Sequence, residues 1–420
     1  PHFLAVLNTD GDPQGIIRHG HERVLRARFN DARFFWDTDQ KHPLRERAAW
    51  LKNVTFQKDL GSYHEKTLRV QRLCSWLSES LKQHGTAVRP GVIHKAALLA
   101  KTDLTTELVK EFTELQGIVG GLYAAVQNLD KGMALATRQS IADAVYDHYK
   151  PESMEDSSPR TTEGAVLSIA DKADSIAGMF ALRLQPTGSK DPFALRRQAN
   201  GIVKTIAEHK LPQSLSQLFA DARETYRGTT AEKKFTVHDP SRAIRDFFRE
   251  RLEFYLREAR GFQYDVVNAV LAAGSDDVVD SVARAEAVQE VLNIPEFRAI
   301  AAASKRMRNI LKQAGEKKSR ISQKFEALTD SSHEETVLAT YLESNAAPIE
   351  LHRQKREYKQ ALQLLSNAQG PVDAFFDKVM VMADDERVRA NRLALLQSIF
   401  QQFSTIADFS EIVIEGQKES

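Results

Sequence analysis

Residues 186–197 read PTGSKDPFALRR and contain the most strongly specified helix start in the chain. Thr-Gly-Ser is typical of a turn, Asp191 is a favourable N-cap residue, and Pro192 suits the first helical position. The Phe-Ala-Leu that follows would begin an apolar stripe. The pattern therefore predicts a helix that begins here and continues to about residue 209.

The same stretch places basic side chains beside the free amides of a helix start. Lys190, Arg196 and Arg197 could therefore hold a phosphate group. In the alternative interpretation, Asp191 caps the helix while the basic side chains lie in solvent or pair locally. The residues alone leave both interpretations open.

The overall composition is that of an ordinary globular protein. The chain has 420 residues, of which 42% are apolar and 27% are charged, which favours two to four domains. Lysine and arginine total 58 against 57 acidic residues, so no global field attracts nucleic acid. Any contact with RNA would have to use local basic patches.

Cysteine usage and hydropathy indicate the cellular compartment in which the chain is expected. Cys74 is its only cysteine, which excludes a disulfide within the chain and a zinc site made of cysteines. A reducing compartment fits this usage. Because no apolar run reaches membrane-spanning length and no signal peptide is visible, we expect a cytoplasmic protein without a membrane partner.

The N-terminal residues alternate in the manner of strands. Residues 3–28 read as a β-hairpin, FLAVLN followed by GIIRHGHERVLRARF, and give the only predicted sheet. FLAVLN looks like a strand entered midway, which suggests an N-terminally truncated chain. The hairpin could be a nucleic-acid surface, or a half-buried hairpin whose polar face is merely basic. Its basic residues are Arg18, His19, His21, Arg23, Arg26 and Arg28.

Beyond residue 43 the apolar periodicity is helical almost throughout, so the fold is predicted to be mainly α. Four ranges follow from composition. Residues 1–42 would end a preceding α/β domain, 43–228 would form a helical domain, and TTAEKKFTVHDP at 229–240 would be a linker. Residues 241–420 would form a second helical bundle.

Two strings resemble the HD superfamily of metal-dependent phosphohydrolases: KTLRVQRLCSWL at 66–77 and AALLAKTDL at 96–104. In that family the corresponding positions carry metal ligands. Here they hold Lys66, Ala100 and Lys101, and only a closing aspartate, Asp171 or Asp174, is present. Protonated lysine and alanine cannot coordinate a metal, so we expect a degenerate HD-like domain without a metal site.

A second resemblance covers more of the chain. Four stretches are similar to the beta subunit of bacterial heterotetrameric glycyl-tRNA synthetase. They are residues 20–47, IADKADSIAGMF at 169–180, PTGSKDPFALRR at 186–197 and FDKVMVMADD at 376–385. The helix pattern of residues 241–420, which ends in RANRLALLQSI at 389–399, resembles the DALR-type anticodon-binding bundle.

The resemblance implies a subunit of glycine-tRNA ligase that binds tRNA(Gly) and supports ATP-dependent aminoacylation. The alpha subunit of an alpha2beta2 heterotetramer would hold the active site with ATP and Mg, and this chain would bind no cofactor and carry no catalytic residue. In agreement, the sequence contains no phosphate-binding glycine loop and no visible synthetase active-site motif.

DALR-type bundles use one face to hold the anticodon loop, and two basic strings here are candidates for that face. Arginine offers phosphate forks and stacking planes, and asparagine can read a base edge. In the alternative, Arg392 pairs with Asp384 or Asp385 and the other side chains are solvated. The candidate residues are Lys305, Arg306, Arg308, Arg389, Asn391 and Arg392.

Two other functions remain open from the sequence. An HD-type phosphohydrolase with a helical accessory domain would release phosphate from nucleotides in manganese buffer. A non-catalytic tRNA-binding protein would lack a synthetase partner.

Overall fold

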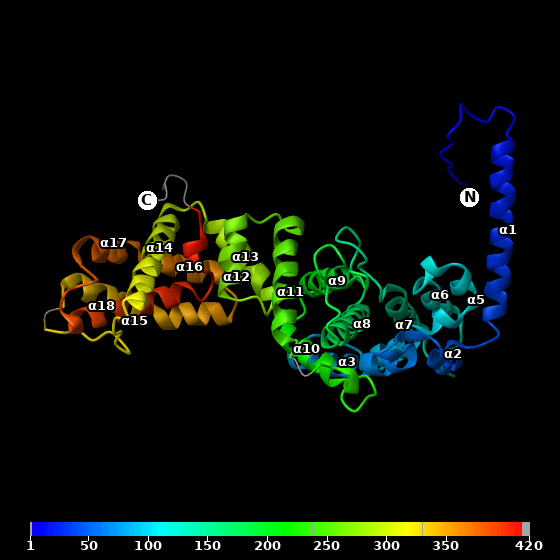
Figure 1. The fold of residues 1–420 in the computed structure, drawn as a ribbon, viewed down its shortest axis with the longest axis horizontal. Helices are drawn as coiled ribbons and strands as arrows, with labels where there is room; N and C mark the ends of the chain where they lie inside the picture. Colours follow the sequence, from blue (N-terminus) through cyan, green and yellow to red (C-terminus); the bar gives the residue numbers. More distant parts are fainter. Residues whose placement is uncertain (1, 237–238, 330, 414–420) are drawn as a thin grey trace. The chain divides into compact units, whose positions relative to one another are not determined.

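The computed structural model describes residues 2–236, 239–329 and 331–413 (Figure 1). Helices dominate this part of the chain, and its only sheet is the antiparallel pair β1 (Thr55–Gln57) and β2 (Gly61–Ser62). The predicted mainly α fold is therefore confirmed. Residues 237–238 of the predicted linker and 414–420 of the predicted C-terminal domain lie outside the described residues.

The chain forms two compact units. Unit 1 comprises residues 1–152, 156–178 and 221–236, and unit 2 comprises residues 153–155, 179–220 and 237–420. Both α8 (Thr162–Ala181) and α10 (Leu215–Glu224) therefore run from one unit into the other. The sequence-based ranges stay predictions. They differ from this division over residues 1–42, which belong to unit 1, and over residues 179–220, which belong to unit 2.

Helix α8 is the central element of unit 1. Every residue from 163 to 178 is buried, although the segment contains four charged side chains. A helix that is buried on all sides needs neighbours on all sides. The other helices of unit 1 are α1 (Ile16–Asp39), α2 (Leu44–Trp50), α3 (Tyr63–Gln83), α4 (Pro90–Leu99), α5 (Glu107–Glu111), α6 (Ile118–Val126) and α7 (Leu135–Asp147).

Helix α3 begins at a capping box. The Ser62 hydroxyl accepts a hydrogen bond from the Glu65 amide, and the Glu65 carboxylate accepts one from the Ser62 amide. This reciprocal pair satisfies two amides that a helix start otherwise leaves free. It fixes the start of α3, and this helix carries the Lys66 and Arg69 side chains into the interior of the unit.

Helices α6 and α7 approach each other closely because α6 carries glycine at the contact. A Cβ atom on Gly121 would lie 2.8 Å from the Cα atom of Tyr146. No larger residue fits unless α7 moves. Gly121 thus serves helix packing.

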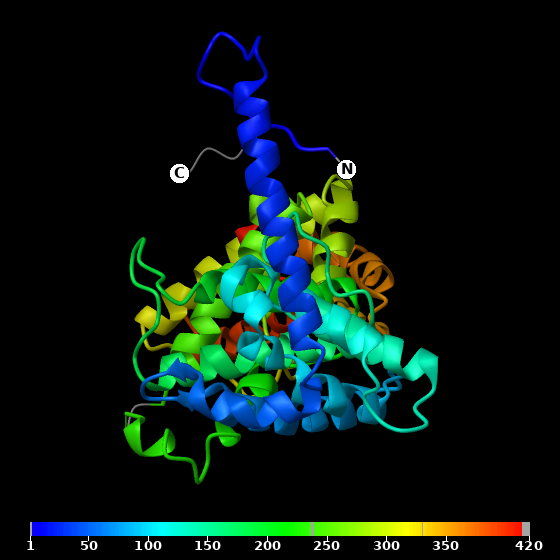
Figure 2. The ribbon, with the colours of Figure 1, turned by 90° about the vertical axis from the view of Figure 1, so that its right-hand side faces the viewer.

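The predicted hairpin over residues 3–28 is wrong, because residues 16–39 form α1. Ile17, Leu25 and Phe29 recur at helical spacing, and the Asp12 carboxylate accepts a hydrogen bond from the Arg18 amide at 2.8 Å, which caps the helix start. Residues 2–8 contain no strand. Figures 1 and 2 show the N-terminal half of α1 projecting from the rest of unit 1.

Unit 2 is built from α9 and the helices that follow α10. Phe297, Phe375, Phe403 and Phe409 lie in its core. Its helices are α9 (Leu195–Glu208), α11 (Ser241–Phe254), α12 (Tyr264–Ala273), α13 (Val278–Val291), α14 (Pro295–Glu316), α15 (His333–Gln354), α16 (Tyr358–Ser366), α17 (Gln369–Lys378) and α18 (Glu386–Phe403).

We expect Gly121→Ala to lower the free energy of unfolding by about 1 to 3 kcal/mol, because the new methyl group overpacks the α6–α7 contact. Gly91→Ala in the first turn of α4 is the control, since no atom lies within 4 Å of its Cβ position. That change should raise stability by about 0.4 to 1 kcal/mol. Urea unfolding of both variants checks the prediction, and equal midpoints would contradict it.

Candidate functional site

Helix α9 begins later than the sequence predicts, at Leu195 rather than beside Pro192. Ala194 precedes it in the left-handed region with φ of 52°, so the chain turns once more before the helix starts. Asp191 nevertheless caps the helix, because its carboxylate accepts hydrogen bonds from the Leu195 amide at 2.8 Å and the Arg196 amide at 2.9 Å. The amides proposed for a phosphate are therefore already engaged.

The three basic side chains of this stretch differ in their surroundings. The Arg196 guanidinium donates a hydrogen bond to the Gly188 carbonyl oxygen at 2.6 Å and so closes the turn. Lys190 and Arg197 are exposed, and neither side chain has a hydrogen-bond or ion-pair partner within the described residues. These two cations remain available for a ligand.

The basic residues of α14 divide in the same way. Arg308 is used by the fold, since its guanidinium lies 2.6 Å from the Glu411 carboxylate and donates a hydrogen bond to the Ser410 hydroxyl at 2.7 Å. Arg306 lies over the Phe376 ring, 4.3 Å from its centroid. Lys305 is exposed. Of these three candidates, Lys305 and Arg306 therefore present cations that no acidic side chain among the described residues neutralises.

Arg389 and Arg392 of α18 make internal contacts. Arg389 donates to the carbonyl oxygens of Ala383 at 2.7 Å and Asp384 at 3.1 Å. Arg392 pairs with Glu335 at 2.5 Å rather than with Asp384 or Asp385. Glu335 is buried and also accepts the Ser332 amide in the capping box of α15, so this pair ties α18 to the start of α15.

Asn391 is only 5% exposed, and both ends of its amide are engaged. Its Nδ2 donates to the Glu326 carbonyl oxygen at 2.8 Å, and its Oδ1 accepts the Glu326 amide at 2.9 Å. The expected base-reading role does not fit this placement, because an RNA base would have to displace both bonds. The sequence offered no sign that its partner is a loop 65 residues away.

The positions nominated by the HD resemblance meet in the interior of unit 1. Lys66 on α3 and Lys101 after α4 both reach Asp171 on α8, with Nζ to carboxylate distances of 3.1 and 2.8 Å. Lys66 also lies 3.2 Å from Asp174. The side chains of both lysines are at most 5% exposed. Two ammonium groups thus neutralise Asp171 and Asp174, the two alternatives that the HD resemblance offers for the closing aspartate.

Asp174 is held from a second side by Arg69. The Arg69 guanidinium lies 2.7 Å from the Asp174 carboxylate and stacks on the Tyr226 ring at 4.1 Å, while the Tyr226 hydroxyl donates to the Asp174 carbonyl oxygen at 2.9 Å. We call Lys66, Arg69, Lys101, Asp171 and Asp174 the buried ion cluster.

The charges of the buried ion cluster determine the direction in which the pKa of Asp171 shifts. Burial raises the pKa of Asp171, but the ammonium groups of Lys101 and Lys66 outweigh burial and hold that pKa well below its usual 3.8. Because the folded pKa is the lower one, the pairing stabilises the fold above the usual pKa and is lost as the pH falls through the folded value.

His148 at the end of α7 completes the surroundings of Lys101. Burial and the Lys101 charge lower the pKa of His148 well below 6.5, so its ring is neutral. A proton on Nδ1 donates to the Val145 carbonyl oxygen at 2.6 Å, and Nε2 accepts from Lys101 at 2.9 Å. His148 was missed from the sequence, where a single histidine in VYDHYK gives no signal of burial.

No group of three or more His, Cys, Asp and Glu side chains within the described residues is arranged to hold a metal ion. In the buried ion cluster, the lysines supply the positive charge that a metal would otherwise bring. A metal-free chain remains a prediction.

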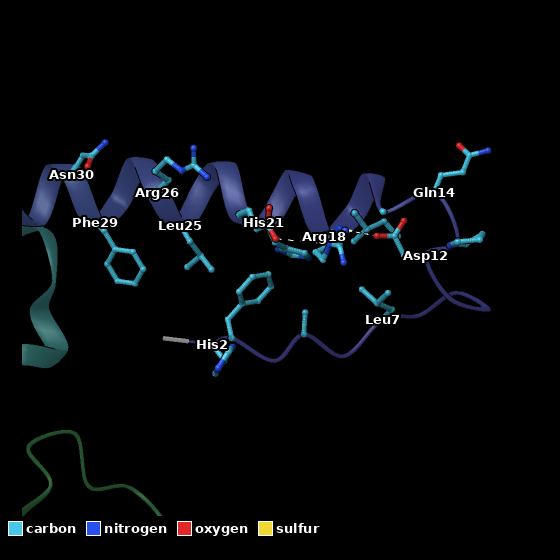
Figure 3. Close-up of a pocket in the computed structure, with 16 residues that line it drawn as sticks. His2, Leu7, Asp12, Gln14, Arg18, His21, Leu25, Arg26, Phe29 and Asn30 are labelled. Carbon is cyan, nitrogen blue, oxygen red and sulfur yellow. Dashed lines mark hydrogen bonds and ion pairs between the residues drawn. The ribbon is translucent and has the colours of Figure 1, made fainter.

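The N-terminal segment forms a groove of about 960 Å³ with α1 (Figure 3). Leu25 and Phe29 point from α1 towards the side on which the N-terminal segment lies, and Leu7 points from that segment towards the helix near Arg18. The basic side chains predicted for a hairpin here lie on the exposed surface of a helix instead. A contact between this helix and nucleic acid stays a prediction.

Comparison with known families identifies two regions. Residues 1–272, more than half of the chain, match the family model of the glycyl-tRNA synthetase beta subunit. The chain belongs to this family. Residues 300–412 match the DALR anticodon binding domain, which confirms the resemblance seen in the C-terminal bundle.

Curated members of the beta subunit family are similar to almost the whole chain. The glycine–tRNA ligase beta subunit of Acidobacterium capsulatum is 50% identical over 419 residues, or 98% of this chain. Those of Syntrophus aciditrophicus and Desulforamulus reducens are 39% and 40% identical over 99% and 98% of it. The chain spans 57% of the length of each of these relatives.

None of the helices within residues 2–236, 239–329 and 331–413 combines the length and hydropathy that a membrane span requires.

We expect Lys101→Met to lower the free energy of unfolding by about 3 to 5 kcal/mol, because it leaves part of the Asp171 charge buried without a partner. Lys95→Met is the matched control, since Lys95 pairs with Asp130 near the surface and its loss should cost at most about 1 kcal/mol. Adding Asp171→Asn to Lys101→Met should recover part of the loss. Chemical denaturation measures all three, and equal losses in the two lysine variants would contradict the prediction.

We also expect the desalted chain to retain no stoichiometric transition metal and to release no phosphate from nucleotides in manganese buffer. The reason is that lysine and alanine stand at the positions where the HD superfamily has metal ligands. Elemental analysis and a phosphate assay test this. Two metals per chain, or manganese-dependent hydrolysis, would restore the phosphohydrolase alternative.

Proposed function

We propose that this chain is the tRNA-binding part of a glycine-tRNA ligase beta subunit. The observation that carries the proposal is the family match over residues 1–272, followed by an anticodon-binding-domain match over 300–412. A tRNA(Gly) molecule would bind through exposed cations. An alpha subunit would supply the aminoacylation site with ATP and Mg, in an alpha2beta2 assembly located in the cytoplasm.

The surroundings of the basic residues separate those that could contact tRNA from those that stabilise the fold. Lys190, Arg197, Lys305 and Arg306 are exposed without an acidic partner among the described residues, so they would contact tRNA phosphates or bases. Arg196, Arg308, Arg389 and Arg392 hold loops and helices through the bonds described above. Their loss would act through the fold.

Unit 1 supports a scaffold role rather than hydrolysis. Its family-related aspartates are neutralised by lysine and arginine side chains, and Cys74 is buried with a raised thiol pKa because of that burial. Paired aspartates and a buried thiol with a raised pKa support a role for this unit that uses neither metal chemistry nor an activated nucleophile at these positions.

We expect the Lys190→Gln/Arg197→Gln double variant to bind tRNA(Gly) more weakly and with a smaller salt dependence. Each lost phosphate contact lowers the slope of log binding constant against log salt by about 0.7 to 0.9, so two contacts lower it by about 1.4 to 1.8. Filter binding of a tRNA(Gly) transcript to the 420-residue chain measures the slope.

The matched control is Lys355→Gln/Lys359→Gln, which removes the same charge near the turn between α15 and α16. It should keep the wild-type slope. A folded Lys190/Arg197 variant with an unchanged slope would show that this stretch is structural, whereas a wild-type chain that fails to bind tRNA would contradict the proposed function itself.

A further inference from the structure

The C-terminal half of α14 and the loop after it carry an unusual concentration of positive charge. Residues 305–324 contain eight lysine and arginine residues and a single acidic one, Glu316, although the whole chain is balanced at 58 basic and 57 acidic residues. Such a segment creates a local positive potential that attracts a polyanion.

Six of these cations, Lys305 and five that follow it, have no hydrogen-bond or ion-pair partner among the described residues. Arg308 is paired with Glu411, and Arg306 stacks on Phe376. The other five lysine and arginine side chains after Lys305 are exposed and make no hydrogen bond or ion pair within the described part of the chain. We call them the basic strip: Lys312, Lys317, Lys318, Arg320 and Lys324.

The loop that carries most of the basic strip has no regular secondary structure, but it is fixed at two points on α18. The Ser322 amide donates to the Ala390 carbonyl oxygen at 3.2 Å. Asn391 holds both the amide and the carbonyl group of Glu326, as described above. Arg320 and Lys324 lie on either side of the first anchor, so Asn391 and Ala390 set where their charges are presented.

A loop that is already fixed loses less conformational entropy when it binds a ligand. We propose that the basic strip binds the phosphate backbone of RNA, and that Asn391 is a positioning residue that acts through this loop. The inference rests on the proposed tRNA-binding function and adds a contact site and a role for Asn391 to it. Lysine point charges suit phosphates rather than base edges.

An anionic membrane surface is the other polyanion that a basic strip could meet. Surface-binding segments combine basic residues with exposed apolar side chains that enter the lipid. No large apolar side chain is exposed among residues 305–329. The composition of the strip therefore favours RNA.

The first test neutralises two strip residues in the full 420-residue chain. Lys317→Gln/Arg320→Gln should lower the log–log salt slope for a tRNA(Gly) transcript by about 1.4 to 1.8, and Lys355→Gln/Lys359→Gln should leave it unchanged. An unchanged slope in the strip variant, while the wild-type chain still binds tRNA, would overturn this inference and leave the proposed function standing. Strip-dependent binding to phosphatidylserine vesicles, without a strip-dependent effect on RNA, would also overturn it.

The second test is a double-mutant cycle between Asn391 and the strip. Asn391→Ala should raise the Kd for the transcript about two- to tenfold by releasing the loop, and it should have a clearly smaller effect in the Lys317→Gln/Arg320→Gln background, where fewer loop charges remain to be positioned. Equal effects in both backgrounds would mean that Asn391 acts through general stability, which would overturn its positioning role. If Asn391→Ala does not fold, Asn391→Asp takes its place, because it keeps the acceptor for the Glu326 amide.

Discussion

The Asp171 carboxylate lies between two lysine ammonium groups in the interior of unit 1, and the surrounding helices depend on that arrangement. Ions in a low-dielectric interior are tolerated only when each charge has a partner at close range. Lys66, Lys101 and Asp171 come from α3, the segment after α4, and α8. These elements therefore cannot shift independently without leaving a charge unpaired.

The HD resemblance drew attention to Lys66, Ala100, Lys101 and a closing aspartate, Asp171 or Asp174, but not to their pairing. The structure brings both lysines and both aspartates together. Tyr226 and His148 were missed, because the resemblance gives neither of them a role. The hairpin error has a different cause. In residues 15–28, apolar residues fit both a two-residue and a four-residue spacing, and the capping carboxylate of Asp12, which favours the helix, lies outside the alternating pattern.

Basic residues could be located from sequence but not sorted into binding and structural ones. The difference depends on partners far away in the chain. Arg392 pairs with Glu335, 57 residues before it, and Arg308 with Glu411, 103 residues after it. Ser332 and Glu335 have the spacing of a capping box, which is a local signal, but that pattern does not reveal that the same glutamate also meets α18. Charge patterns therefore indicate candidates, and packing decides among them.

The return of residues 221–236 to unit 1 has a consequence for how the gene can be divided. Tyr226 covers Arg69 and Asp174, yet it is encoded after the 42 residues from 179 to 220 that belong to unit 2. An expression fragment that stops anywhere in that insertion would expose a buried arginine to solvent. A recombination event at the same place would do likewise. Residues 221–236 must therefore stay with the rest of unit 1 in any fragment that keeps the Arg69–Asp174 pair covered.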